Sequence, residues 1–170
     1  MGAMPITDSL IAELEMESNT TRRVLERVPS DKLTWKPHEK SMSLGRLAQH
    51  VATIPGLISG WSKSDALAIE DFKPEPEPTS TQEILSALAA SVEDAKKVLA
   101  ATDDTRVMGM WSMTAGGKPI FSVPRAGLLR NIMLNHLYHH RGQLSVYLRL
   151  LNVPVPSIYG PSADENPMEM

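Results

Sequence analysis

Four segments of this chain repeat their apolar residues at helical intervals, and this pattern restricts the fold more than any other feature. Helices are expected at about residues 8–27, 44–58, 81–101 and 124–151. Short connectors join them, and sequence signals for strands are nearly absent. Because each amphipathic helix must bury its apolar face against another element, the sequence predicts an all-α protein, an antiparallel four-helix bundle.

Capping residues, proline and glycine mark the ends of these helices. Ser43 is a suitable N-cap for the second helix, and Ser80 begins a capping box at the third. Residues 72–79 between them are rich in proline and cannot be helical. The helical period also stops between residues 107 and 123, where Gly116-Gly117 is typical of a turn. A short irregular hairpin is therefore expected before the last helix.

The composition excludes several classes of protein. The net charge is −3 and lysine and arginine form no cluster, which argues against a nucleic-acid partner. No apolar run approaches the roughly 18 residues of a membrane span, so no membrane partner is expected. Cysteine is absent, which fits a cytoplasmic protein and leaves only imidazole, carboxylate and water as metal ligands. Met1-Gly2-Ala3 is interpreted as a cloning remnant, and a single domain is expected over residues 4–170.

Two histidines of the last helix have the spacing of metal ligands. His136 and His140 are one turn apart, about 40° from each other on the helix, in the middle of its apolar face. Two buried imidazoles without an ion would need partners for four ring nitrogens in an apolar core. His50, on the apolar face of the second helix, could complete a three-histidine site. Leu137 stands where a zinc peptidase of the His-Glu-x-x-His type has its general base, so that chemistry is disfavoured.

Other polar residues near these histidines are weaker candidates. Gln143 could accept a ring N–H and orient a ligand, although a polar residue at the edge of the helix packing would look the same. His139 lies at the edge of the apolar face and is expected beside the site without binding the metal strongly. Arg141 is expected on the solvated face, and His38 in an exposed loop.

Several motifs, taken in order, resemble the DinB/YfiT-like superfamily over nearly the whole chain. They are Trp35-Lys-Pro37, Ser43-Leu-Gly-Arg-Leu-Ala-Gln-His50, His136-Leu-Tyr-His-His-Arg-Gly-Gln143 and Pro156-x-x-Tyr-Gly160. The resemblance implies a four-helix bundle that holds a divalent metal with one histidine of the second helix and two of the last. These correspond to His50, His136 and His140. It also implies a homodimer.

Thiol-dependent enzymes, bacillithiol transferases and mycothiol-dependent maleylpyruvate isomerase, belong to this superfamily. The resemblance therefore suggests a metal-dependent transferase or isomerase whose partners are a small-molecule thiol and an electrophilic substrate. Imidazole ligands favour nickel or zinc, and iron and manganese are also compatible. Two alternatives remain open, a hydrolase that uses metal-bound water and a non-catalytic metal or ligand binder. If the small-molecule thiol carries carboxylates, basic side chains should bind them. The candidates are Arg46, Arg125, Arg130 and Arg141.

Overall fold

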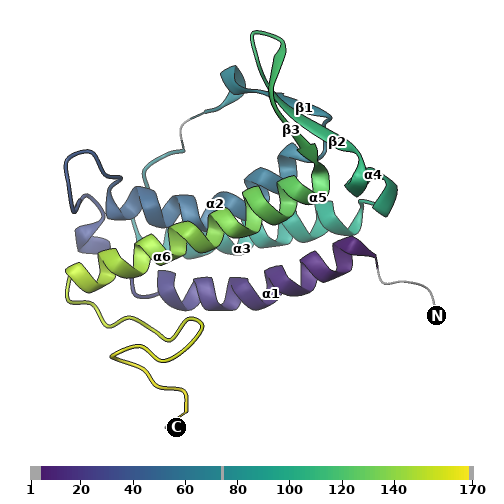
Figure 1. The fold of residues 1–170 in the computed structure, drawn as a ribbon. Helices are drawn as coiled ribbons and strands as arrows, with labels where there is room; N and C mark the ends of the chain where they lie inside the picture. Colours follow the sequence, from purple (N-terminus) through teal and green to yellow (C-terminus); the bar gives the residue numbers. More distant parts are fainter. Residues whose placement is uncertain (1–4, 74, 169–170) are drawn as a thin grey trace.

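Four long helices make up most of the computed structural model, which describes residues 5–73 and 75–168 (Figure 1). They are α1 (Ile6–Leu25), α2 (Leu44–Trp61), α3 (Thr81–Ala100) and α6 (Asn135–Leu150). Helix α2 packs against both α3 and α6, and α1 packs mainly against α3. Each long helix contributes fully buried apolar side chains to one core, among them Leu14, Leu47, Ile84 and Leu144. The apolar periodicity of the sequence thus indicated the regions of the four long helices, although the last of them begins only at Asn135.

The helix caps follow the sequence signals. The Ser43 hydroxyl accepts the backbone N–H of Arg46 at 3.1 Å, and the Ser80 hydroxyl accepts that of Glu83 at the same distance. Both bonds satisfy N–H groups that have no partner inside the helix. The first helix begins and ends two residues earlier than predicted, at Ile6 and Leu25.

A three-stranded sheet, absent from the all-α prediction, lies beyond one end of the long helices (Figure 1). The expected hairpin is present as β2 (Met110–Ala115) and β3 (Lys118–Pro124), which are antiparallel. Its turn places Gly116 and Gly117 at φ angles of 53° and 74°, a conformation that glycine adopts without a Cβ clash. The strand β1 (Ala66–Ala68) pairs in parallel with β2. Its three residues are too few to show an alternating pattern, so the fold is mostly helical with a small sheet.

The last helical region is less regular than predicted. One continuous helix was expected over residues 124–151. Instead α5 (Arg125–Gly127) leads into a π-helical segment, η3 (Leu128–Leu134), which is followed directly by α6. The remaining short helices are η1 (Ser30–Lys32), η2 (Ile69–Asp71) and α4 (Asp104–Met108). Among the described residues, no helix combines the length and apolar character needed to cross a membrane.

A buried ion pair joins α6 to α1, and it corrects the prediction that Arg141 is solvated. Only 1% of the Arg141 side chain is exposed, and its Nη1 lies 2.7 Å from Oε2 of Glu17. The guanidinium also donates to the hydroxyls of Thr21 and Tyr159 at 3.1 and 2.6 Å. The position of Arg141 on the helix pointed away from the histidines, but that side faces α1 and the C-terminal segment rather than water.

Candidate metal centre

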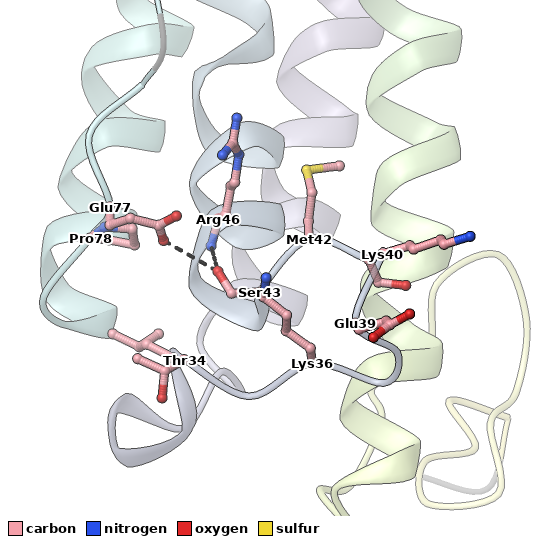
Figure 2. Close-up of a pocket in the computed structure, with 11 residues that line it drawn as sticks. Thr34, Lys36, Glu39, Lys40, Met42, Ser43, Arg46, Glu77 and Pro78 are labelled. Atoms are coloured by element: carbon pink, nitrogen blue, oxygen red, sulfur yellow. Dashed lines mark hydrogen bonds between the residues drawn. The ribbon is translucent and has the colours of Figure 1, made fainter.

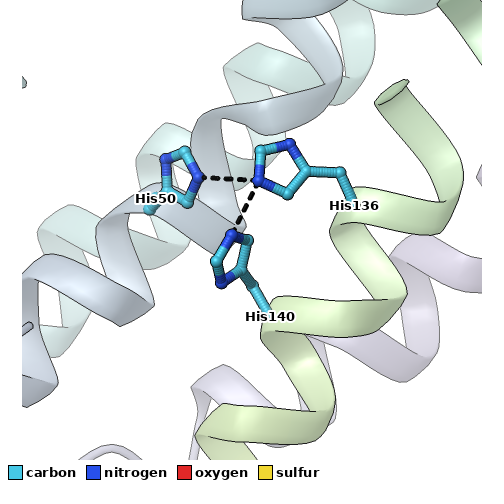
Figure 3. A group of neighbouring side chains, drawn as sticks. All are labelled: His50, His136 and His140. Carbon is cyan, nitrogen blue, oxygen red and sulfur yellow. Dashed lines mark hydrogen bonds between the residues drawn. The ribbon is translucent and has the colours of Figure 1, made fainter. Parts of the chain in front are cut away.

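The structure brings His50, His136 and His140 together, although His50 is far from the other two in the sequence (Figure 3). Helix α2 supplies His50, and α6 supplies the other two from consecutive turns. Nε2 of His136 lies 3.4 Å from Nε2 of His50 and 2.7 Å from Nε2 of His140. All three side chains are partly buried, and one ligand atom from each lies within 4.8 Å of the others.

These separations suit a single small cation. With metal–nitrogen bonds of about 2.0–2.1 Å, two ligand atoms of a tetrahedral site are about 3.4 Å apart. The His50–His136 separation already has this value. The His136–His140 pair is closer, and a small rotation of the two rings would widen it. The three residues therefore fit a mononuclear site that leaves a coordination position for another molecule.

The second nitrogen of each ring has its own partner. Nδ1 of His140 lies 2.7 Å from Oε1 of Gln143, which accepts the ring N–H. Nδ1 of His50 lies 3.7 Å from Oε2 of Glu75, and His136 hydrogen-bonds to the backbone of Ile132. Such partners fix the orientation of an imidazole and leave the lone pair of Nε2 free for a metal.

Sequence reasoning found only some of these contacts. Gln143 contacts the ring of His140, which is the contact required by the orienting role considered for it from the sequence. The exposed His139 lies beside the ring of His140, with 4.8 Å between ring centroids, and is not part of the three-histidine group. Glu75 was missed because it lies in the proline-rich connector, where no periodicity shows which way a side chain points. His38 is exposed as expected.

The environment keeps the paired histidines of α6 neutral. Burial lowers the pKa of His136 to about 4, with smaller contributions from His140 and His50. Burial also lowers the pKa of His140. A hydrogen bond with Gln143 raises this pKa, but the effect of burial is larger. Burial raises the pKa of Glu75, but hydrogen bonds with His50 and Thr53 outweigh this effect, so its pKa lies below the ordinary value. A cation requires its imidazole ligands to be neutral, and an ionised carboxylate nearby also favours its binding.

The low pKa of His136 makes the metal-free protein sensitive to acid. The unfolded chain binds this proton near the ordinary pKa of 6.5, whereas the folded chain binds it only near about 4. The stability of the folded state should therefore be retained above about pH 6.5 and fall as the pH drops toward 4. Urea unfolding of chelator-treated protein at several pH values measures this loss. We expect the loss of stability at low pH to be smaller in His136→Gln and unchanged in His38→Gln. Equal losses in the unmodified protein and both variants would contradict the expectation.

Glu75 should strengthen metal binding without touching the metal. Its carboxylate is close to His50 and also accepts a hydrogen bond from Thr53 of α2. Substitution of such an outer partner commonly weakens metal affinity about 10- to 100-fold. We therefore expect Glu75→Gln to lower the affinity within this range in a competitive chelator titration. Glu77→Gln, in the same connector, is the matched control, and an equal loss in both variants would exclude a specific role for Glu75.

A cavity of about 560 Å³ lies beside the histidines, and His50 and His136 form part of its wall. Its other lining residues come from α2 and the loop before it, from β1 and η2, and from the connector that follows η2. A second cavity of about 490 Å³ adjoins it near the start of α2 (Figure 2). Met42 and Arg46 line both cavities. A small molecule in the first cavity would therefore lie next to the open side of the candidate site.

Only one of the four arginines considered from the sequence lines these cavities. Arg46 does so from α2, one turn before His50. Arg125 is buried and donates to backbone carbonyls of Ser62, Ser64 and Met110, and Arg141 is buried against α1. Arg130 donates to Asn135 and pairs with Glu13. Three of the four thus have structural partners elsewhere.

Comparison with known proteins identifies the family of this chain. The model of the DinB family matches residues 4–169. The chain belongs to the DinB family. It is also 27% identical over 161 residues to the Bacillus subtilis protein YrdA, described as uncharacterized, an alignment that covers 93% of this chain and 90% of YrdA.

Two solved structures have the same fold as this DinB-family chain. A DinB-like protein from Bacillus cereus superposes with a TM-score of 0.71 at 23% sequence identity, covering 89% of this chain and 97% of its own. The DinB-like protein YjoA from Bacillus subtilis gives a TM-score of 0.68 at 21% identity, with coverage of 85% and 92%. At these identities, the likeness supports the fold and leaves the chemistry to be argued from the site.

Proposed function

We propose that this DinB-family protein is a metal-dependent enzyme that activates a small external thiol for reaction with an electrophile, as a transferase or isomerase. The observation that carries the proposal is the convergence of three Nε2 atoms beside a cavity, with an acceptor for the other nitrogen of each ring. Histidines that only fill a protein core do not need their Nε2 atoms to converge. Histidines that bind a metal do, and their second ring nitrogens usually have a hydrogen-bond partner.

The donor set indicates which cations fit. Three imidazoles favour nickel or zinc, while iron(II) and manganese remain compatible. Neutral ligands leave the double positive charge of the ion uncompensated, and the ion would then lower the pKa of a thiol or water that coordinates it. In this proposal Gln143, Glu75 and the backbone of Ile132 hold the rings in place, and the cavity admits the reactants.

The thiol must come from outside the protein, because the chain has no cysteine. Thiolate is the reactive form of sulfur, so a site that stabilises it at neutral pH makes a small thiol a nucleophile. Support for a thiol from outside rests on the family and on the absence of cysteine from the sequence, while support for the metal rests on geometry.

Activity profiling tests the proposal directly. Protein loaded with nickel or zinc is assayed with a panel of small thiols and the electrophile 1-chloro-2,4-dinitrobenzene. We expect turnover that requires both thiol and metal, that a chelator abolishes and that added metal restores. The thiol should also change the visible spectrum of cobalt-substituted protein, because sulfur enters the coordination sphere. Metal-dependent hydrolysis of 4-nitrophenyl acetate without thiol would instead favour a hydrolase, and metal binding without turnover of either substrate would favour a binding protein.

A further inference from the structure

The cavity beside the histidines has an apolar wall that the rest of the fold leaves uncovered. Trp61 and Phe72 stack with 5.1 Å between ring centroids and 13° between their planes, and Leu57 and Leu67 complete this wall. Leu57 and Phe72 are 41% and 43% exposed, so part of this wall is open to solvent. A volume of about 560 Å³ falls within the range of about 300–1,000 Å³ that is typical of small-molecule sites.

A cationic side chain lies between this wall and the neighbouring cavity. Arg46 is exposed, and its guanidinium makes no hydrogen bond or ion pair with the part of the chain that the structure describes. Figure 2 shows its side chain extending away from Ser43 and Glu77 in the same direction as that of Met42. Because Arg46 precedes His50 by four residues, both side chains project from the same face of α2.

None of the other charged residues of the cavity forms a direct contact with the guanidinium of Arg46. Glu75 is already engaged by Thr53 and His50. Asp71 and Lys73, both exposed, contribute one charge of each sign. The lining is therefore neutral overall, but the guanidinium of Arg46 has no hydrogen bond or ion pair among the described residues and can pair with a bound anion. The planar guanidinium of arginine is the side-chain group best suited to pair with a carboxylate.

We propose that this cavity binds an organic acid whose apolar body lies against Leu57, Trp61, Leu67 and Phe72 and whose carboxylate pairs with Arg46. The inference rests on the proposed function, which it deepens by naming the electrophilic substrate as an acid of this kind. Arg46 acts as a specificity-determining residue that orients the substrate, while the apolar wall supplies most of the buried contact area.

A pair of matched probes tests the inference without any reaction. 4-Phenylbutyrate and 4-phenylbutan-1-ol share an apolar body and differ in the terminal carboxylate. Calorimetric titration of both into chelator-treated and zinc-loaded protein should show that the acid binds about tenfold more tightly than the alcohol in both forms. Arg46→Gln should abolish this preference. Leu57→Ser, at a half-exposed position, should weaken both probes by a similar factor.

The control is Arg22→Gln, which removes the same charge from an exposed pair on α1 and should leave the acid preference intact. Equal binding of acid and alcohol, or no binding of either, would overturn the inference. So would an acid preference that survives Arg46→Gln or appears only with zinc, because the carboxylate would then bind elsewhere or to the metal. Failure of the proposed function has a different signature, since thiol-dependent turnover would be absent while the Arg46-dependent binding of the acid to metal-free protein persisted.

Discussion

Replacing His136 and His140 together with alanine should reduce bound metal from about one ion per chain to a level indistinguishable from zero. The two residues supply two of three converging Nε2 atoms, and one imidazole cannot hold a divalent cation against water and buffer. The metal should also stabilise the unmodified protein, by about 4 kcal/mol at a free concentration a thousand times its dissociation constant. Elemental analysis and thermal unfolding with and without metal measure the two effects.

The neighbouring histidine provides a matched control for this experiment. His139 is exposed and outside the three-histidine group, so His139→Ala should retain most of the metal. His140→Ala should lose it, although the two residues are adjacent in the sequence. Full occupancy in the double variant, or equal losses in His139→Ala and His140→Ala, would be incompatible with the proposed site.

The largest effect on stability is expected at the ion pair between α6 and α1. Arg141→Met should lower the free energy of unfolding by about 3–5 kcal/mol, because the Glu17 carboxylate would stay buried without its cation. Adding Glu17→Gln to this variant should recover part of the loss, since no unpaired charge then remains. Urea unfolding of the two single variants and the double variant measures the coupling between the residues.

An exposed pair on α1 is the control for this second prediction. Arg22 pairs with Glu26 at 2.9 Å, but both side chains are largely exposed to solvent. Arg22→Gln should therefore cost less than about 1 kcal/mol. If Arg141→Met proved as mild as Arg22→Gln, the buried pair would not stabilise the packing of α6 on α1.

The grouping of the three histidines could be predicted from the sequence, whereas most of their surroundings could not. His136 and His140 share a helix, so their spacing alone placed them side by side, and Gln143 followed from the same periodicity. Periodicity also put His50 on the inner face of α2. The proximity of Glu75 to His50 depends on the path of a connector with no regular period, so no sequence pattern could reveal it.

Two features of the fold could not be predicted because they depend on contacts between residues far apart in the sequence. The three residues of β1 acquire their strand conformation from hydrogen bonds to β2, more than forty residues away. Arg141 was predicted to be solvated because a helical projection gives the direction of a side chain and does not show which residues that side chain contacts. The acidic partner on α1 that makes burial of this arginine favourable becomes apparent only when the two helices are packed.

The π-helical turns of η3 determine the direction in which the side chains of the following helix, α6, point. A π-turn holds one residue more than an α-turn, and each residue rotates a helix by about 100°. Loss of a single residue between Leu128 and Leu134 would restore ordinary winding and turn His136 and His140 away from His50, unless the upstream segment rotated instead. Length variation among relatives should therefore be suppressed in these seven positions and tolerated in the Gly116-Gly117 turn, where an added residue only lengthens a loop.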